Sequence, residues 1–243
     1  MRNPYERSIQ HGLHGVFAKA ARQVVRSCGL RSAIRTFDYR FYTHTHRRVG
    51  SSKPFGSKGD SVGRVQRRPI EAKFYPVFDD DSPPNAEYFR ELERVCKHRI
   101  LFGGNFFLDY LGAASCIIVW DKERRGMSQA DCEIAWTDLP GQSRVFRFRW
   151  NGMLQGNMKD KEVRINATQK PIALYEWIYQ QFAKQGDRIL DTHLGSGSSR
   201  IAAYRAGLDF VGLEISKPIF DLEEERYAAY TSQMCLFTEA IND

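Results

Sequence analysis

Two acidic residues and two glycines lie close together towards the end of the chain, in the stretch RILDTHLGSGSSRIAAYRAGLDFVGLEIS. Asp191 ends a short apolar run and is followed by Gly195 and Gly197. Glu214 ends a second apolar run, 19 positions after Gly195. Glycine lets a backbone come close to a ligand, and a carboxylate at a strand end can accept hydrogen bonds from ribose hydroxyls. These residue types at this spacing predict a site for a nucleotide or nucleoside.

The elements that would position these residues are a strand, a tight turn, a helix and a second strand. Residues 189–190 are apolar, residues 201–206 carry apolar side chains at helical spacing, and residues 210–213 are apolar again. Gly207 stops the helix before the second strand. We therefore expect half of a nucleotide-binding α/β unit, with both acids at the carboxyl ends of strands.

The residues around the glycines separate three classes of ligand. A phosphate-binding P-loop requires Lys and then Ser or Thr after its last glycine, but Ser198 and Ser199 follow Gly197. A dinucleotide fold has glycine or alanine three residues after its second glycine, where this chain has Arg200. ATP and NAD are therefore disfavoured. A ligand with a positive charge and no phosphate suits Asp191, and S-adenosylmethionine meets that description.

Several segments resemble the amino-type DNA methyltransferases, which methylate adenine N6 or cytosine N4. Residues 191–198 (DTHLGSGS) resemble the cofactor loop of that family. Residues 169–171 (QKP) resemble the segment that precedes this loop when the chain is permuted, with its catalytic half first. Three segments resemble successive strands of the catalytic half, in the expected order: residues 102–107 (FGGNFF), 117–122 (IIVWDK) and 131–137 (DCEIAWT). The resemblance runs from about residue 74 to the C-terminus.

The resemblance implies an α/β fold with a doubly wound, Rossmann-like methyltransferase sheet that is incomplete at the N-terminus. It implies S-adenosylmethionine as the cofactor and double-stranded DNA as the partner. The residues that it assigns to cofactor binding are Gln169, Lys170, Pro171, Asp191, Thr192, Gly195, Ser196, Gly197 and Glu214. It assigns no catalytic residue, because the Asp/Asn/Ser-Pro-Pro-Tyr loop of the family does not occur in this sequence.

Some of these residues have a structural alternative. Asp191 could cap the following helix, and Glu214 could be an ordinary surface carboxylate. Lys170 could be solvated, and Pro171 could mark the first turn of the next helix.

Residues 71–243 are expected to form the methyltransferase domain. Its expected helices are residues 86–96, 172–184 and 217–233, and its expected strands are residues 100–102, 116–120, 132–136 and 144–150. The strands at 100–102 and 116–120 are apolar enough to be buried on both faces. Residues 151–166 form a long polar connection, and long loops in compact domains are usually functional or disordered.

Aromatic and basic residues of this domain have two interpretations. We expect Trp120 in the core with Asp121 in a turn or ion pair, and the pair at 106–107 (FF) in the core rather than stacked on a base. Arg147 and Arg149 alternate with aromatic residues, which gives a basic strand face that could follow a DNA backbone or be solvated.

Composition limits the class of protein. The chain of 243 residues with 42% hydrophobic content is long enough for one α/β domain. It has no apolar stretch of transmembrane length and no signal-peptide pattern, so we expect a soluble, cytoplasmic protein without a membrane partner. Its 5 cysteines form no Cys-x-x-Cys pair and have no histidines at zinc-finger spacing, so neither a metal nor a disulfide framework is expected.

The first 70 residues carry the positive charge of the chain. They hold 15 of the 36 Lys and Arg and 3 of the 29 Asp and Glu, a net charge of +12, which leaves −5 for residues 71–243. Residues 1–70 show little periodicity and are typical of a basic, poorly structured arm that could grip DNA phosphates. We therefore place the domain boundary between residues 70 and 71.

The genetic code offers another interpretation of this segment. When residues 5–35 are back-translated with free choice of synonymous codons and read one nucleotide later, they can encode MNEVFNMDCMEYLPKLPDK, one ambiguous codon, and then FDLAVCDPPYG. That product supplies the strand, helix and Asp-Pro-Pro-Tyr loop with which the permuted methyltransferases begin. We therefore expect an out-of-frame translation from about residue 5 to a point before residue 55.

The sequence thus predicts a site-specific DNA methyltransferase that transfers a methyl group from S-adenosylmethionine to an exocyclic amine and is inactive as written. Adenine N6 is the expected target if the shifted frame is genuine. One alternative is a non-catalytic DNA-binding protein on a decayed methyltransferase fold. Another is a methyltransferase acting on RNA or a small molecule.

Overall fold

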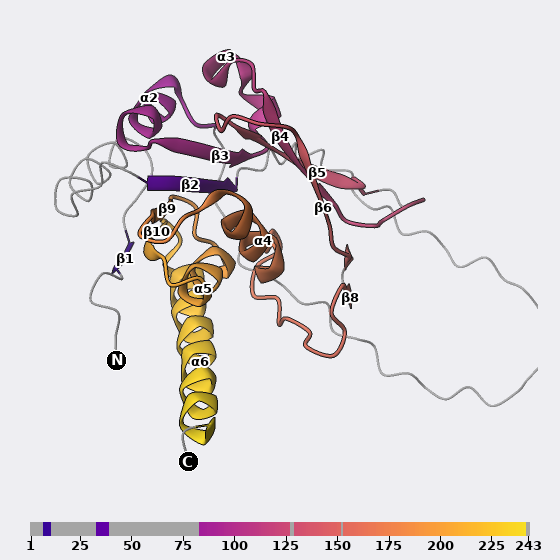
Figure 1. Ribbon diagram of the computed structural model, residues 1–243, viewed down its shortest axis with the longest axis vertical. Coiled ribbons are helices and arrows are strands. Elements are labelled where there is room, and N and C mark those ends of the chain that lie inside the picture. The colour runs from indigo at the N-terminus through magenta and orange to yellow at the C-terminus, as the bar shows by residue number, and fades with distance from the viewer. Residues whose placement is uncertain (1–6, 11–32, 39–82, 127–128, 152, 242–243) are drawn as a thin grey trace, which may run out of the picture.

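A central sheet organises the chain (Figure 1). The computed structural model describes residues 7–10, 33–38, 83–126, 129–151 and 153–241, with side chains described between residues 83 and 233 of those ranges. Within them, the strands of the main sheet lie in the spatial order β1 (Arg7–Gln10), β10 (Asp209–Glu214), β9 (Arg188–Asp191), β2 (Ala33–Asp38), β3 (His98–Phe102), β5 (Cys132–Thr137), β4 (Cys116–Asp121) and β6 (Arg144–Arg147). Two short strands, β7 (Trp150–Asn151) and β8 (Leu154–Gln155), form a separate antiparallel ladder.

The order in which the chain visits its parallel strands creates a switch point at the middle of this sheet. The ladders from β1 through β10, β9 and β2 to β3 are all parallel, and β5 runs antiparallel to both of its neighbours. From β9 the chain crosses to β10 on one side, and from β2 it reaches β3 on the other. In open α/β sheets, ligands bind beyond the carboxyl ends of the strands at such a point. Asp191 and Glu214 both end strands at this edge.

Helices cover both faces of the sheet, as a doubly wound fold requires. Figure 1 shows α2 and α3 above the sheet, α4 and α5 below it, and α6 running away from it to the C-terminus. The helical elements are α2 (Ala86–Val95), the 3₁₀ turn η1 (Gly104–Phe106), α3 (Leu108–Leu111), α4 (Ile172–Phe182), α5 (Ser198–Arg205) and α6 (Lys217–Ile241).

Strand β3 shows how the two faces are filled. Ile100 and Phe102 belong to the core that also contains buried residues of α4 and α5, whereas Leu101 packs with Phe89 and Leu92 of α2. Successive side chains of a strand point to opposite faces, so β3 contributes to both layers. The prediction that this strand is buried on both faces is confirmed.

Most expected elements are present with shifted ends. Asn85 caps α2 by accepting a hydrogen bond from the Tyr88 amide at 3.1 Å, and this helix ends one residue earlier than expected. The expected strand 144–150 is interrupted after Arg147 and resumes as β7. On β4 the face opposite the core is only half-buried, so the prediction of burial on both faces is wrong there.

Two strands lie within the first 70 residues, where the sequence pattern indicated none. Strand β1 pairs with β10, and β2 fills the place between β9 and β3. Open strand edges present backbone groups that need hydrogen-bond partners, and these two segments supply them. The rest of residues 1–70 lies outside the described ranges. The domain boundary and the out-of-frame origin of this segment stay predictions.

Candidate cofactor-binding site

The loop between β9 and α5, residues 192–197, lies at the switch point. Gly195 has φ 54° and Gly197 has φ 72°, both in the left-handed region that favours glycine. A Cβ on Gly197 would come within 2.2 Å of a carboxylate oxygen of Glu223, so this position also requires the absence of a side chain. Thr192 and Ser196 are buried. The predicted tight turn is confirmed, and packing as well as conformation requires its second glycine.

Asp191 stabilises the conformation of this loop by accepting hydrogen bonds within the protein. It is 2% exposed, and its Oδ1 accepts a hydrogen bond from the His193 amide at 3.0 Å. Its Oδ2 accepts a hydrogen bond from the Ser199 hydroxyl in the first turn of α5. Gly197 is the N-cap residue of α5, so the alternative in which Asp191 caps that helix is wrong. The carboxylate instead fixes the direction in which the chain leaves β9.

Glu214 braces the same loop from the neighbouring strand. It is 7% exposed, so the alternative of an ordinary surface carboxylate is wrong. Its Oε2 accepts a hydrogen bond from the Gly195 amide at 2.9 Å, and its Oε1 accepts one from the Ser216 amide at 2.9 Å. The acid 19 positions after Gly195 therefore contacts that glycine directly.

The loop directs several of its amides towards acceptors inside the protein. Besides the two that reach the carboxylates, the Leu194 amide donates to the Leu213 carbonyl at 2.9 Å and the Gly197 amide to the Leu194 carbonyl at 3.0 Å. The amides used in this way are those of His193, Leu194, Gly195 and Gly197. A phosphate site needs such amides to point at the ligand. This loop is therefore unsuited to a phosphate and suits a ligand that does not require those amides.

The segment at 169–171 is buried. The Lys170 side chain has no exposed surface, and its Nζ lies 3.1 Å from Glu133 Oε2 and 4.8 Å from the Phe102 ring centroid. The solvated alternative for Lys170 is therefore wrong. Pro171 is the N-cap residue of α4, immediately before its first turn. Gln169 accepts a hydrogen bond at its Oε1 from the Ile165 amide, at 2.9 Å. Cofactor contacts by these residues stay a prediction.

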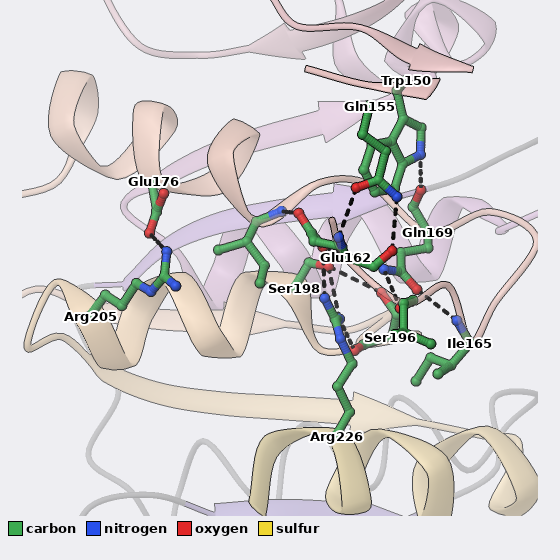
Figure 2. Close-up of polar contacts among 12 residues, drawn as sticks. Trp150, Gln155, Glu162, Ile165, Gln169, Glu176, Ser196, Ser198, Arg205 and Arg226 are labelled. Atoms are coloured by element: carbon green, nitrogen blue, oxygen red, sulfur yellow. Dashed lines mark hydrogen bonds and ion pairs between the residues drawn. The ribbon is translucent and has the colours of Figure 1, made fainter. Parts of the chain in front are cut away.

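An ion pair that the sequence did not indicate holds the outside of the loop (Figure 2). Arg226 of α6 donates to the Ser196 carbonyl at 2.5 Å and to the Ser198 hydroxyl at 3.0 Å. It also pairs with Glu162 at 2.8 Å, and Glu162 accepts a hydrogen bond from the Ile172 amide of α4 at 2.8 Å. Burial raises the pKa of Glu162 and lowers the pKa of Arg226. Glu162 belongs to the long connection 151–166, whose length was the available signal.

A second buried pair, Arg200 with Glu223, lies next to Gly197 of the loop. Arg200, which separated this loop from a dinucleotide motif, lies 2.9 Å from Glu223 and 2.6 Å from Glu224, both on α6. Its guanidinium carbon lies 3.8 Å from the centroid of the Tyr227 ring. Burial raises the pKa of Glu223 to about 7, against the opposing effect of Arg200. The side chain at position 200 therefore fastens α5 to α6.

Helix α2 reaches the loop from the other half of the sheet. The Tyr88 hydroxyl lies 3.1 Å from Thr192 Oγ1, and its ring contacts the His193 ring edge to face at 5.9 Å between centroids. Thr192 Oγ1 also lies 3.0 Å from His193 Nδ1. The two sides of the switch point are thus joined at the loop itself.

The aromatic residues for which two interpretations were considered differ in burial. Trp120 is fully buried and Asp121 pairs with Arg147 at 3.6 Å, which confirms the structural interpretation of both. Phe107 is buried, but Phe106 is 61% exposed, so the expectation that both lie in the core is wrong for Phe106. The 3₁₀ turn η1 turns Phe106 outwards after β3 ends.

Two absences apply to the described ranges alone. No helix there is both long and apolar enough to cross a membrane. No cluster there of three or more His, Cys, Asp or Glu residues could hold a metal ion.

Comparisons with known proteins found one matching family model and several similar proteins. Residues 114–225 match the family model described as DNA methylase. The chain is 35% identical over 164 residues to the type II methyltransferase M2.DpnII of Streptococcus pneumoniae, covering 66% of this chain and 59% of that protein. It is 32% identical over 157 residues to the type II methyltransferase M2.LlaDCHI of Lactococcus lactis subsp. cremoris, covering 65% and 58%. The chain thus spans somewhat less than two thirds of the length of either relative.

A solved structure shows the same fold. The crystal structure of the M1.HpyAVI–SAM complex aligns with 90% of this chain and 98% of its own, with a TM-score of 0.53 and 16% sequence identity. At this identity the likeness extends to the arrangement of helices and strands. The expected doubly wound α/β sheet is therefore confirmed.

Proposed function

We propose, on the premise that residues 114–225 belong to the DNA methylase family, that this chain is an amino-type DNA methyltransferase that binds S-adenosylmethionine at residues 191–197. The substrate of the proposed reaction is an exocyclic amine of double-stranded DNA. The chain spans only part of its type II relatives, so substrate and partner rest on this family and on the site.

The observation that carries the proposal is the internal use of the loop amides by Asp191 and Glu214. Two carboxylates beside the loop repel a phosphate and attract a cation. Both are well buried, which strengthens their electrostatic effect. S-adenosylmethionine carries a sulfonium charge and ribose hydroxyls but no phosphate, so the residues present fit it better than they fit ATP or NAD.

Methylation of an amine depends mainly on the relative position of the methyl donor and the amine. The cofactor supplies an activated methyl group, and the protein must align that group with the amine and bind charge that develops on the nitrogen. Asp191, Glu214 and Gly197 fix the loop on which the donor would lie. Gln169, Lys170 and Pro171 would close the methionine end of the site. In the family the Asp-Pro-Pro-Tyr loop handles the amine, and this sequence lacks it.

We therefore expect the chain as written to transfer no methyl groups. If residues from about 5 to a point before 55 are an out-of-frame translation, the intact gene would encode the missing loop, in the form usual for adenine N6 enzymes. Sequencing the gene checks the codons first. If the codons for residues 31–35 cannot yield Asp-Pro-Pro-Tyr-Gly in the shifted frame, the out-of-frame proposal fails.

Transfer of a labelled methyl group from S-adenosylmethionine to double-stranded DNA tests the function. We expect no incorporation with the polypeptide as written and incorporation with the protein encoded by the frame-restored gene. Robust transfer by this exact polypeptide would overturn the proposed inactivity. Absence of transfer by the restored protein, with cofactor bound and DNA of varied sequence supplied, would overturn the function.

A further inference from the structure

A chain of hydrogen bonds leads from the β7–β8 ladder to the cofactor loop (Figure 2). Gln155 of β8 donates from its side chain to the Glu162 carbonyl and accepts from the Glu162 amide, both at 2.8 Å. Glu162 pairs with Arg226, and Arg226 donates to Ser196 and Ser198. The Glu162–Arg226 link joins residues that are 64 positions apart in the sequence.

The central pair of this chain is enclosed. The side chains of Arg226 and Glu162 are 13% and 16% exposed, and both charges therefore have strongly reduced access to water. Removing one partner of such a pair leaves the other as a poorly compensated charge. Three bonds from one guanidinium also fix its orientation, because its donors have a rigid planar arrangement.

We propose that Glu162 and Arg226 are positioning residues that hold the Ser196 carbonyl and the start of α5 in the conformation that binds the cofactor. This inference rests on the proposed function for the identity of the ligand. Both residues would act through the loop rather than on the reacting atoms. Arg226 sets the loop, and Glu162 sets Arg226 while joining it to the N-terminus of α4 through Ile172. Glu162 thereby makes the connection between β8 and α4 part of the cofactor site.

The chain provides a matched control. Arg205 of α5 pairs with Glu176 of α4 at 2.5 Å, so this pair also joins α5 to a neighbouring element. Its side chains are 36% and 29% exposed. Figure 2 shows this pair well apart from Ser196 and Ser198. A general loss of an ion pair on α5 would affect both pairs alike, whereas positioning of the loop involves only the first.

The experiment compares Glu162→Gln and Arg226→Lys with Glu176→Gln in the full chain. Calorimetry measures the affinity for S-adenosylmethionine, and amide hydrogen exchange measures opening of residues 192–199 without ligand. We expect Glu162→Gln to weaken cofactor binding by about tenfold or more, because bonds to charged groups are stronger than neutral ones. We expect faster exchange confined to that loop. Arg226→Lys keeps the positive charge but lacks the planar donors. We therefore expect its loss of cofactor affinity to lie between those of Glu162→Gln and Glu176→Gln.

Glu176→Gln should change affinity by less than about twofold, because exposed pairs contribute little. Equal effects of Glu162→Gln and Glu176→Gln, or unchanged loop exchange in both Glu162→Gln and Arg226→Lys, would overturn the inference. If Glu162→Gln does not fold, the inference is tested with Arg226→Lys instead, by its affinity for S-adenosylmethionine and by the amide exchange of residues 192–199. If the unsubstituted chain does not bind S-adenosylmethionine, the proposed function and the cofactor role of the pair both fail. The exchange comparison then still shows whether the pair holds the loop.

Discussion

The cofactor loop and the β4–β6 edge of the sheet use ion pairs of the same kinds in opposite environments. At the loop, Glu162 pairs with Arg226 at 2.8 Å and Arg200 with Glu223 at 2.9 Å, all with side chains no more than 16% exposed. At the edge, Asp121 pairs with Arg147 at 3.6 Å and Glu123 with Arg149 at 3.6 Å, and the two arginines are 72% and 52% exposed.

This difference in exposure separates ion pairs that fix the conformation of the loop from ion pairs whose charges can change partner. A buried pair has lost its hydration and is strongly destabilised when one partner is removed, so it enforces one arrangement. An exposed pair contributes roughly 0 to 1 kcal/mol and exchanges readily with solvent ions. The arginines at the edge can therefore turn to a DNA phosphate, whereas those around the loop cannot without breaking the site.

Gly197→Ala should have the largest effect on stability. Alanine at φ 72° is strained, and its Cβ would meet Glu223 at 2.2 Å. Together the strain and the overpacking should lower the free energy of unfolding by about 3 kcal/mol or more. Gly186→Ala is the control, because Gly186 also has positive φ, 87°, but open space around it. It should cost only about 1 to 2 kcal/mol by urea denaturation. Equal losses would show that the contact with Glu223 is unimportant.

Glu223→Gln should change how stability depends on pH. The folded pKa of Glu223, about 7, lies above its ordinary value of 4.5, so the folded state binds this proton more tightly than the unfolded state. This contribution is fully present below about pH 4.5 and is lost as the pH rises to about 7, by up to about 3 kcal/mol. The groups facing it are Arg200, Arg226 and Glu224.

Urea denaturation at about pH 5 and about pH 8 measures this contribution. The unsubstituted chain should lose more stability between the two than Glu223→Gln, whose amide does not titrate. Glu224→Gln is the control, since Glu224 contacts the same arginine from a side chain that is 43% exposed. If Glu223→Gln and the unsubstituted chain lose the same amount, Glu223 is not held protonated by burial.

Replacing Arg147 and Arg149 by alanine should have the smallest effect on folding. Arg147 ends β6 and Arg149 lies between β6 and β7, and both side chains are exposed, so we expect less than about 0.5 kcal/mol of lost stability for each. If this face follows the DNA backbone, each substitution should also reduce the slope of log affinity against log salt by about 1. Titration of labelled duplex DNA at several salt concentrations checks this. An unchanged slope would assign the face to solvent.

Local patterns predicted the loop well and its surroundings poorly. Asp191, Gly195, Gly197 and Glu214 are close in sequence or end adjacent strands, so their spacing defines the turn and its two acids. Arg226 and Glu162 are 64 positions apart, and the pair forms only when α6 packs beside the connection 151–166. No periodicity reports such a contact.

Two other differences have separate causes. Phe106 is exposed because a 3₁₀ turn begins directly after Gly103, which has the left-handed conformation at φ 73°. The apolar character of residues 106–107 does not reveal that turn. Strands β1 and β2 have weak patterns of their own, and their pairing depends on the open edges of β10, β9 and β3.

The most direct test of the central claim is calorimetry of the full chain with S-adenosylmethionine and, separately, with ATP. Because four of the loop amides donate to Asp191, Glu214 and internal carbonyls, we expect saturable binding of S-adenosylmethionine and none of ATP. Saturable binding of ATP by a folded chain that does not bind S-adenosylmethionine would contradict the account.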